Sequence, residues 1–303
     1  MQMKNRIYFY FFSYIKIGDF MKRKLISLFI ILFILGFSFF SCNKAVILAR
    51  NSDPIMKEII KNKSKYKIDS VSPVIKNDEY KYGINGCKVD EIKSYNNMKQ
   101  IGYYDDNLID LKEDKIQIDS NNKYIIGSNN IDKNVSIIFI INKRINNNII
   151  NMVKEKNLKI NLFVDSYFLE NNLEYIEKIS KYFTIYNYGF DNYYDDKYIT
   201  YHNNLIDSIT NNKSIYCLTN KNNKNTLNIC TKNNMKVIKE DYYKNNILTS
   251  TKDNLKNGNI LVYKDINNKI APINVSLNYI IKKGYNIIYL DDLLTSKKDC
   301  SKK

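Results

Sequence analysis

The chain has 303 residues, 44% of them apolar, and it has a formal charge of +16 with a single histidine, His202. This length and apolar content suffice for a full-sized buried core, which excludes a disordered chain. The lysines are spread singly and no nucleic-acid-binding motif is present, so no nucleic-acid partner is expected. Lysine is among the residues favoured by the overall composition, so a generic basic surface is the preferred interpretation of the charge. If a partner uses the charge, an anionic envelope polymer or a membrane surface fits best.

The single histidine restricts the possible chemistry. Hydrolytic zinc sites usually take two or three histidine ligands. A metal site with several histidines is therefore excluded, and neither a metal nor another cofactor is expected. His202 lies in a polar stretch, residues 200 to 204, and we expect it to be exposed at the start of a helix.

The N-terminal 42 residues have the pattern of an export signal. A cationic start, Met21 to Lys24, precedes an apolar run from Leu25 to Phe40. Sixteen residues of helix span about 24 Å, less than the roughly 30 Å hydrocarbon core, so a signal is preferred to a spanning helix. Residues 1–20 are interpreted as a mis-assigned start upstream of Met21. We therefore expect the protein at the extracytoplasmic face of a bacterial membrane.

Cys42, directly after Ser41, resembles the lipid-accepting cysteine of bacterial lipoproteins. Lipidation of Cys42 is the favoured hypothesis, and an uncleaved anchor or a coincidental cysteine are the alternatives. The other cysteines are too dispersed for a zinc cluster, and export permits disulfides. Cys217 and Cys230 are the predicted pair; two buried free thiols are the alternative.

Composition divides the remaining chain into four parts. Residues 43–80 form a polar linker with two prolines, and residues 81–133 form a small N-terminal cap that contains a helix over 91–99. Residues 134–295 form the main domain. Residues 296–303 form a basic tail.

Strands and helices alternate from Asn134 onward. The run Val135 to Ile141 is continuously apolar and rich in β-branched residues, as in a buried parallel strand. Further strands are predicted at residues 159–165, 183–188, 214–218, 235–238, 260–263 and 285–290, with helices between them. About seven β/α units predict an α/β fold with a parallel sheet closed into a barrel.

Three of these segments resemble the polysaccharide deacetylase (NodB-type) family. Val135 to Phe139 is similar to its first strand, Lys159 to Asp165 to its second, and Lys282 to Leu294 to its terminal signature. Gly83 to Lys112 is similar to the N-terminal extension of deacetylase-like proteins of low-GC anaerobic bacteria. The resemblance covers Asn134 to Leu294 and implies a distorted (β/α) barrel that removes acetyl groups from N-acetylated sugars of cell-wall polymers.

The family's catalytic residues are absent from the matching positions. Its two consecutive aspartates, one metal ligand and one base, fall on Ile140 and Ile141, and its metal-binding histidine pair falls on Tyr188 and Asn192. Its late histidine falls on Tyr263. The reaction needs a metal to polarise the amide and a carboxylate to deprotonate water. The resemblance therefore implies the fold without catalytic or metal-binding residues.

Three functions follow from this pattern. The first is a non-enzymatic domain that binds cell-wall glycan, since tyrosine rings offer flat faces and hydroxyls to sugars. Its candidate ligand-binding residues are Tyr186, Tyr188, Asn192, Tyr263 and Asp165, with Phe190, Tyr193 and Tyr194 at the rim. Tyrosine is abundant throughout the chain, so core packing or compositional bias is the alternative explanation of this cluster.

The second function is a hydrolase with a rebuilt site. It requires clustered carboxylates, and Asp191, Asp195 and Asp196 are the dense group near the expected cleft; a solvated turn is the alternative. The third is a scaffold lipoprotein that acts through protein contacts. The ligand and the oligomeric state stay open at this point.

Overall fold

The computed structural model describes residue 28 and residues 31–38, 40–116, 120–129, 131–240 and 246–300. The chain forms two compact units. The first unit comprises Met1–Tyr66 and Val89–Asp110, and the second comprises Lys67–Lys88 and Leu111–Lys303. The boundaries expected from composition do not coincide with these units, because parts of the expected linker and cap, residues 67–88 and 111–133, belong to the second unit and residues 89–110 to the first.

The first unit contains an apolar helix over Ile31–Ser52, in which the most apolar stretch of 18 residues has a mean hydropathy of 2.0. Its length and composition would allow it to cross a membrane, and a signal sequence near the N-terminus has the same properties. The helix continues past Cys42, whose thiol is free and exposed.

Two helices, α2 (Pro54–Asn62) and α3 (Glu91–Ile101), are joined through Asp53. Its carboxylate caps α2 by accepting a bond of 2.9 Å from Ile55 N, and it also accepts bonds from Tyr95 Oη (3.0 Å) and Lys99 Nζ (2.7 Å) of α3. The short helices η1 (Lys63–Tyr66) and η2 (Asp106–Leu108) complete this unit. The first part of the predicted linker is thus helical, because residues 43–52 continue the apolar helix and α2 and η1 follow.

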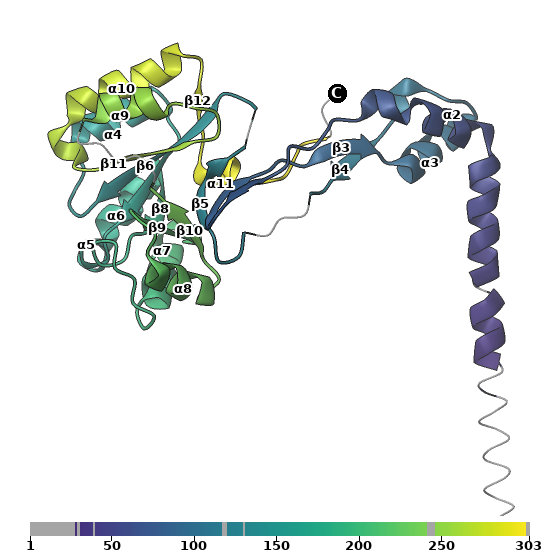
Figure 1. The fold of residues 1–303 in the computed structure, drawn as a ribbon, viewed down its shortest axis with the longest axis horizontal. Helices are drawn as coiled ribbons and strands as arrows, with labels where there is room; N and C mark the ends of the chain where they lie inside the picture. Colours follow the sequence, from purple (N-terminus) through teal and green to yellow (C-terminus); the bar gives the residue numbers. More distant parts are fainter. Residues whose placement is uncertain are drawn as a thin grey trace, which may run out of the picture. The chain divides into compact units, whose positions relative to one another are not determined.

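The second unit contains two large sheets (Figure 1). The first sheet has the order β11-β6-β7-β8, all parallel, and comprises β6 (Asn134–Ile141), β7 (Ile160–Val164), β8 (Phe183–Asn187) and β11 (Ile260–Tyr263), with β12 (Asn286–Ile287) parallel to β6. The second has the order β1-β2-β5-β10-β9 and comprises β1 (Val74–Lys76), β2 (Glu79–Tyr82), β5 (Tyr124–Ser128), β9 (Tyr216–Thr219) and β10 (Lys236–Lys239). Only the β1–β2 pair in that sheet is antiparallel. A separate pair joins β3 (Gly86–Val89) and β4 (Leu111–Asp114).

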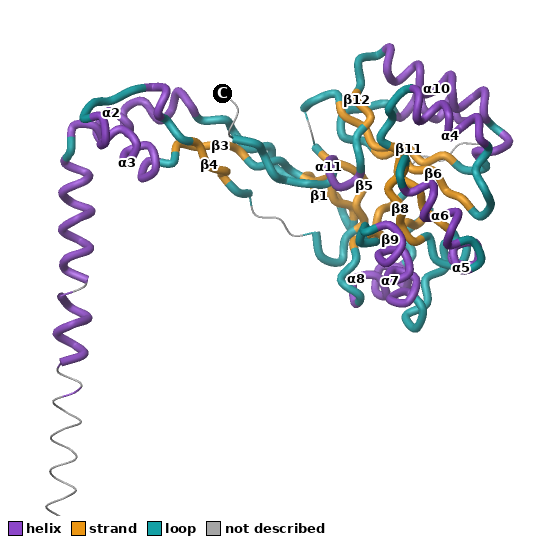
Figure 2. Tube along the Cα trace, turned by 180° about the vertical axis from the view of Figure 1, so that it is seen from behind, coloured by secondary structure: helices purple, strands orange, loops and turns teal. Residues whose placement is uncertain are grey.

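Helices follow most of the strands and cover the sheets from outside. They are α4 (Asn147–Glu155), α5 (Ser166–Glu170), α6 (Leu173–Ser180), α7 (Ile199–Thr210), α8 (Lys224–Lys232), α9 (Ile247–Asn254), η3 (Ile266–Asn268), α10 (Ile270–Lys282) and α11 (Leu290–Leu293). In Figures 1 and 2, α4, α9 and α10 lie together beside β6 and β11, whereas α7 and α8 lie beside β8 and β9.

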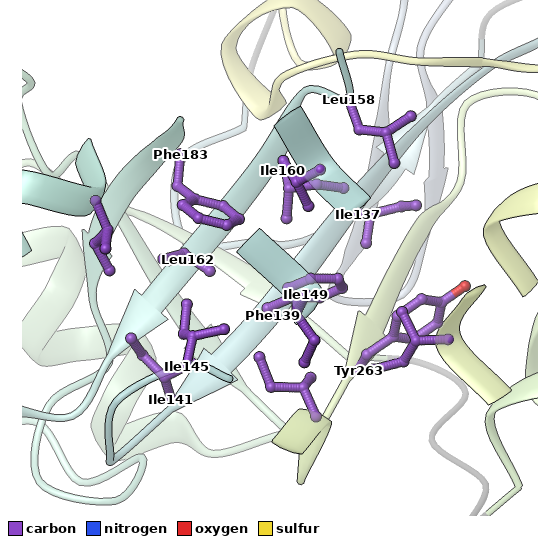
Figure 3. Packing of buried hydrophobic residues seen from close by; sticks show 14 of the residues in the cluster. Ile137, Phe139, Ile141, Ile145, Ile149, Leu158, Ile160, Leu162, Phe183 and Tyr263 are labelled. Carbon is purple, nitrogen blue, oxygen red and sulfur yellow. The ribbon is translucent and has the colours of Figure 1, made fainter. Parts of the chain in front are cut away.

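The alternation of side chains along the strands divides the core into two layers. On β6, Phe139 faces an outer cluster between the sheet and its helices, which Figure 3 shows with Ile137, Ile141, Leu162 and Tyr263. Ile138 faces an inner cluster that draws residues from both sheets: Tyr80, Tyr82, Ile125, Phe163, Tyr186, Tyr216, Leu218 and Ile238. Two separate sheets that share one inner core are consistent with the expected distorted barrel. The α/β class is confirmed.

Strands of the expected cap and linker belong to this barrel-like body. β2 and β5 pair with each other, and β5 pairs with β10, so that the registers join Tyr80 to Ile125 and Ile125 to Ile238. Tyr80 and Tyr124 are fully buried there. The apolar side chains of these short strands cannot be buried in an isolated cap, and the open edge of β10 supplies their partner.

Both disulfides of the structure lie in the second unit. Cys217 on β9 is bonded to Cys230 on α8, with their Cα atoms 6.4 Å apart, as the sequence analysis expected. Cys87 on β3 is bonded to Cys300 across 213 residues. The expected tail is held as well, because Asn85 N donates to Ser296 O at 2.7 Å and Lys298 N to a carboxylate oxygen of Glu113 at 2.6 Å.

Candidate functional site

A cavity of about 340 Å³ lies at the carboxyl ends of four parallel strands. It is lined by Ile140, Ile141, Asn142, Lys143, Tyr188, Asp191, Asn192, Asn220, Lys264, Asp265, Ile266 and Asn267. These residues come from the ends of β6, β8, β9 and β11 and from the loops that follow them. The carboxyl ends of parallel strands are where α/β folds place their ligands.

The four family positions expected to lack metal ligands meet in this cavity. Ile140 and Ile141 end β6, while Tyr188 and Asn192 follow β8. The sequence alone assigned these four residues to the family's metal and base positions. Their meeting in one cavity supports that assignment. The cavity therefore corresponds in place to the metal centre that the resemblance implies, with different side chains.

Tyr263 does not line the cavity, contrary to the expectation. It pairs with Phe139 in the β6–β11 register, and both rings face the outer cluster, where they stack with centroids 5.8 Å apart. The Tyr263 hydroxyl lies 2.8 Å from Thr251 Oγ1. Because successive side chains of a strand alternate, the next residue, Lys264, points to the cavity side. Leu261 and Tyr263 face the outer cluster, so the alternation of side chains along β11 could have predicted from the sequence that Lys264 faces the cavity.

Lys264 forms an ion pair with a buried acid, Glu240. Its Nζ lies 2.8 Å from Glu240 Oε2, and the Glu240 side chain is only 3% exposed. Burial raises the pKa of the Glu240 carboxyl, and the Lys264 ammonium opposes that shift. Among the described residues, Glu240 Oε1 has no hydrogen-bond partner.

A tight hairpin over residues 190–193 forms one wall of the cavity. Phe190 and Tyr193 exchange backbone hydrogen bonds of 2.8 and 3.0 Å, and between them Asp191 and Asn192 have positive φ values of 48° and 70°. Positive φ at both central residues is the requirement of a type I′ turn, which aspartate and asparagine tolerate. The tip, Asp191 and Asn192, lines the cavity.

Asp165 positions this hairpin and does not line the cavity, so its expected role as a ligand contact is corrected. Its Oδ1 caps α5 by accepting from Phe168 N (3.2 Å), and its Oδ2 accepts from Asp191 N (2.8 Å). Asn187 acts beside it, because its Oδ1 accepts from Gly189 N at 2.8 Å. Both oxygens of the Asp165 carboxylate therefore accept hydrogen bonds from backbone N–H groups.

The tyrosines expected around the ligand divide into two groups. Tyr186 and Tyr194 are buried in the interior: Tyr186 Oη donates to Asp291 Oδ2 (3.0 Å), and Tyr194 Oη donates to Asn187 O (3.2 Å). Tyr188 does line the cavity. Burial raises the pKa of Tyr188, and the nearby Glu240 carboxylate raises it further. Of the five predicted ligand residues, Tyr188 and Asn192 reach the cavity.

The three acids proposed for a rebuilt hydrolytic site are not gathered. Asp191 lines the cavity. Asp195 Oδ1 accepts from Lys197 N at 2.8 Å in the turn before α7, and Asp196 is paired with Lys232 and Asn233. Of the three acids, only Asp191 lies at the cavity, whereas Asp195 stabilises a turn and Asp196 forms a surface ion pair.

His202 is buried, with 1% of its surface exposed, so the expectation of an exposed helix-start residue is wrong. It lies on the inward face of α7 with Ile199 and Ile206, at the helical spacing i, i+3 and i+7. Its Nδ1 lies 3.2 Å from Ser166 Oγ and its Nε2 lies 2.7 Å from Glu170 Oε1. Because Ser166 is fully buried, this serine, histidine and glutamate set joins α5 to α7 and offers no accessible nucleophile.

The metal implied by the resemblance does not fit this cavity. Its four positions offer two aliphatic chains, a phenol and an amide, and the imidazole of His202 is bound to Ser166 and Glu170. The described residues contain no group of three or more His, Cys, Asp or Glu side chains able to hold a metal ion. Catalytic zinc requires three such ligands.

No protein-family model matches the sequence, and no curated protein matches it. Solved structures do. A CE4 family pseudoenzyme from Bacillus anthracis, BA3943, is similar at 17% identity and a TM-score of 0.58 over 82% of this chain and 97% of that chain. A mutant of the same pseudoenzyme, described as having restored enzymatic activity, is similar at 18% identity and a TM-score of 0.59 over 82% of this chain and all of that chain. The fold expected from the resemblance is thereby confirmed: this chain has the fold of the CE4 polysaccharide deacetylases, shared with a pseudoenzyme of that family.

Proposed function

We propose that this protein binds an N-acetylated cell-wall glycan in the cavity without hydrolysing it. The observation that supports the proposal is the replacement of all four metal and base positions, gathered in one cavity, by Ile140, Ile141, Tyr188 and Asn192. Without a carboxylate or imidazole at these positions, the family's base and its metal ligands are both missing. What is left is a concave site with mixed polarity.

The lining suits an acetamido sugar. Ile140, Ile141 and Ile266 offer an apolar surface for the acetyl methyl group, and Asn192, Asn220 and Lys264 offer hydrogen-bonding groups for its carbonyl and the ring hydroxyls. A volume of about 340 Å³ falls within the range of small-ligand sites. The pseudoenzyme BA3943 offers a precedent for this fold without activity.

The proposed place of action is the outer face of the bacterial membrane. The helix over Ile31–Ser52 would hold the chain there as a signal anchor, or Cys42 would do so after lipidation. The positive charge of the chain adds attraction to anionic envelope polymers.

The test uses the full chain in lipid nanodiscs, titrated with N-acetylglucosamine oligomers and, as the matched ligand, with the same oligomers after chemical deacetylation. Saturable binding that is at least tenfold weaker for the deacetylated oligomers is expected. Asn220→Trp, which places a large side chain at the cavity rim, should abolish binding. Asn225→Trp, on the exposed side of α8, is the matched control and should bind as the wild type does.

Acetate release is measured in parallel with added Zn²⁺, Co²⁺ or Mn²⁺. No release above the protein-free blank is expected. Metal-dependent release would overturn the non-catalytic proposal and favour the hydrolase hypothesis, with Asp191 and Asp265 as its cavity carboxylates. Absence of both binding and turnover would favour the scaffold hypothesis.

A further inference from the structure

His202, the chain's only histidine, contacts the hairpin over residues 190–193 that forms one wall of the cavity. Its buried imidazole lies edge to face with the ring of Phe190, the first hairpin residue, with centroids 5.2 Å apart. Its Nε2 lies 2.7 Å from Glu170 Oε1, and its Nδ1 lies 3.2 Å from Ser166 Oγ. Both ring nitrogens therefore have polar partners, and the needs of those partners assign the protons on the ring.

A short chain of hydrogen bonds connects the imidazole to the start of the hairpin. Ser166 Oγ lies 3.2 Å from Asn187 Oδ1, and the same Oδ1 accepts from Gly189 N at 2.8 Å. Gly189 has a φ of 70°, and a Cβ atom there would lie 2.4 Å from Tyr193 O, so the chain enters the hairpin through a position that requires glycine. Ser166 N also donates to Gly189 O at 2.8 Å. The placement of Gly189 thus depends on Ser166 and Asn187.

The protons in this chain of bonds can be counted. Gly189 N can only donate, so the Asn187 atom that faces it is an oxygen. The two oxygens Asn187 Oδ1 and Ser166 Oγ need a proton between them, and only the serine hydroxyl has one to supply. With its proton placed there, Ser166 Oγ accepts from His202, so Nδ1 carries a hydrogen.

The other ring nitrogen requires a proton as well. An ionised carboxylate can only accept, so the contact of 2.7 Å with Glu170 Oε1 places a hydrogen on Nε2. A contact this short is typical of a charge-assisted hydrogen bond. All the bonds of the chain are therefore made at once when the imidazole of His202 carries a proton on each nitrogen and is paired with the Glu170 carboxylate.

We propose that His202 is a positioning residue that makes glycan binding depend on pH, because its doubly protonated form supports the hairpin through Ser166, Asn187 and Gly189. Loss of one proton to solvent keeps the stronger bond to Glu170 and turns Nδ1 into an acceptor, which takes the Ser166 proton away from Asn187. Two oxygens then face each other without a proton, and the support of Gly189 weakens. The hairpin tip lines the cavity, so binding should weaken as the pH rises. This inference rests on the proposed function.

The titratable groups that contact the imidazole come from two elements. Glu170 belongs to α5, and Tyr198 and Tyr201, whose ring centroids lie 6.2 and 5.3 Å from that of His202, belong to the start of α7. The hairpin contributes the uncharged ring of Phe190. Phenols keep their proton below about pH 9, whereas histidine is the side chain that ordinarily changes charge between about pH 5 and 8. A change of this network within that range therefore reports on His202 and Glu170.

The first part of the test needs no ligand. The untagged full chain, labelled with ¹⁵N-histidine and held in nanodiscs, gives the signals of a single imidazole. Both ring nitrogens should show the shifts of N–H nitrogens at pH 5.5, and the two shifts should diverge as the pH rises to 8.5. Hydrogen exchange of the amides over residues 188–194, corrected for its intrinsic pH dependence, should become faster with the same midpoint. A ring whose number of protons does not change over this range, or an exchange rate without that midpoint, would overturn the proposal.

The second part measures the affinity for the N-acetylglucosamine dimer over the same pH range. The wild type should bind at least fivefold more weakly at pH 8.5 than at pH 5.5, with the midpoint of the imidazole signals. Glu170→Gln, at a side chain that is 35% exposed, removes the anionic partner and should move both midpoints to lower pH. Glu177→Gln, which neutralises an exposed carboxylate on α6, is the matched control and should leave both midpoints unchanged.

The outcomes separate this inference from the proposed function. Constant affinity over the range, or a pH dependence that Glu170→Gln leaves in place, would overturn the role of His202 alone. Failure of the wild type to bind the dimer at any pH would overturn the proposed function and pH-dependent binding with it. The imidazole and exchange profiles, measured without ligand, would still show in that case whether His202 supports the hairpin.

Discussion

Asp165 Oδ2 accepts a hydrogen bond of 2.8 Å from the backbone N–H of Asp191, which ties the start of α5 to the tip of the hairpin. The same carboxylate caps α5 through its other oxygen. Since Asp191 and Asn192 both have positive φ values, the hairpin tip depends on such external bonds to keep its shape.

Asp165→Ala should therefore reduce both stability and binding. Loss of the cap and of one partly buried hydrogen bond is expected to lower the free energy of unfolding by about 2 kcal/mol. Glycan binding should weaken because the cavity wall moves. Urea unfolding measures the stability. Titration with the N-acetylglucosamine dimer, at a temperature where the variant is folded, measures the binding. If a folded Asp165→Ala variant binds the N-acetylglucosamine dimer as tightly as the wild type does, Asp165 does not position the hairpin for binding.

The Glu240 carboxyl should make stability depend on pH. Burial raises its folded-state pKa above the ordinary value of 4.5, so the folded chain holds the proton more tightly than the unfolded chain does. Its stabilising contribution is complete below pH 4.5 and is lost as the pH rises through the folded-state pKa. Lys264 and Tyr188, which face this carboxyl, do not reverse the direction of the shift.

Glu240→Gln removes that titration and keeps an oxygen acceptor for Lys264. The Tm of the wild type should fall relative to that of the variant between pH 4 and pH 7. Differential scanning fluorimetry at fixed ionic strength measures both profiles. Parallel profiles would show that Glu240 has the same pKa in the folded and unfolded chains.

The two disulfides should differ in their effects on stability. The bond between Cys217 and Cys230 closes a separation of 13 residues, and that between Cys87 and Cys300 closes one of 213. Loop entropy predicts losses of about 3 and about 5 kcal/mol respectively when each pair is replaced by alanine. Guanidinium unfolding of the two double variants tests this order, with the reduced wild type as the reference for loss of both. Equal losses would contradict the entropic account.

Restoring the family residues should create a metal site. The variant with Ile140→Asp, Ile141→Asp, Tyr188→His and Asn192→His places two carboxylates and two imidazoles around the same cavity. It should bind about one Zn²⁺ per chain, and Zn²⁺ should raise its Tm, whereas the wild type should show neither effect. The apo variant should be less stable than the wild type by about 2 to 4 kcal/mol, because Ile141 is buried. A folded variant that binds no Zn²⁺ would show that these four positions do not have the geometry of a metal site.

The local features of the fold could be predicted from the sequence because each has a local cause. The apolar run of β6 indicates a strand buried on both faces, and Gly102 ends α3 with a φ of 82°. The resemblance to the family then placed Ile140 at one site with Tyr188 and Asn192, although Ile140 ends β6 and the other two residues follow β8.

Long-range pairings and side-chain orientation had no such local signal. The pairing of Tyr124 with Val237 joins strands far apart in the chain, and so does the bond between Cys87 and Cys300. His202 stands in a polar stretch, yet helical spacing from Ile199 turns it inward. Tyr263 was predicted to line the cavity, but the cavity residue is its neighbour Lys264. Successive side chains of a strand point to opposite faces, so a shift of one residue moves a side chain from the cavity to the core.

The interleaving of the two units has a consequence for dissecting the protein. The chain passes between the units at 66/67, 88/89 and 110/111, so no single cut separates them. A fragment beginning at Asn134 would contain the segment that resembles the family but would lack β2 and β5, leaving β10 as a bare edge and removing Tyr80 and Ile125 from the inner cluster. Truncation at that apparent boundary would therefore yield an aggregating species, and a null result obtained with it would reflect lost sheet pairing and not lost affinity.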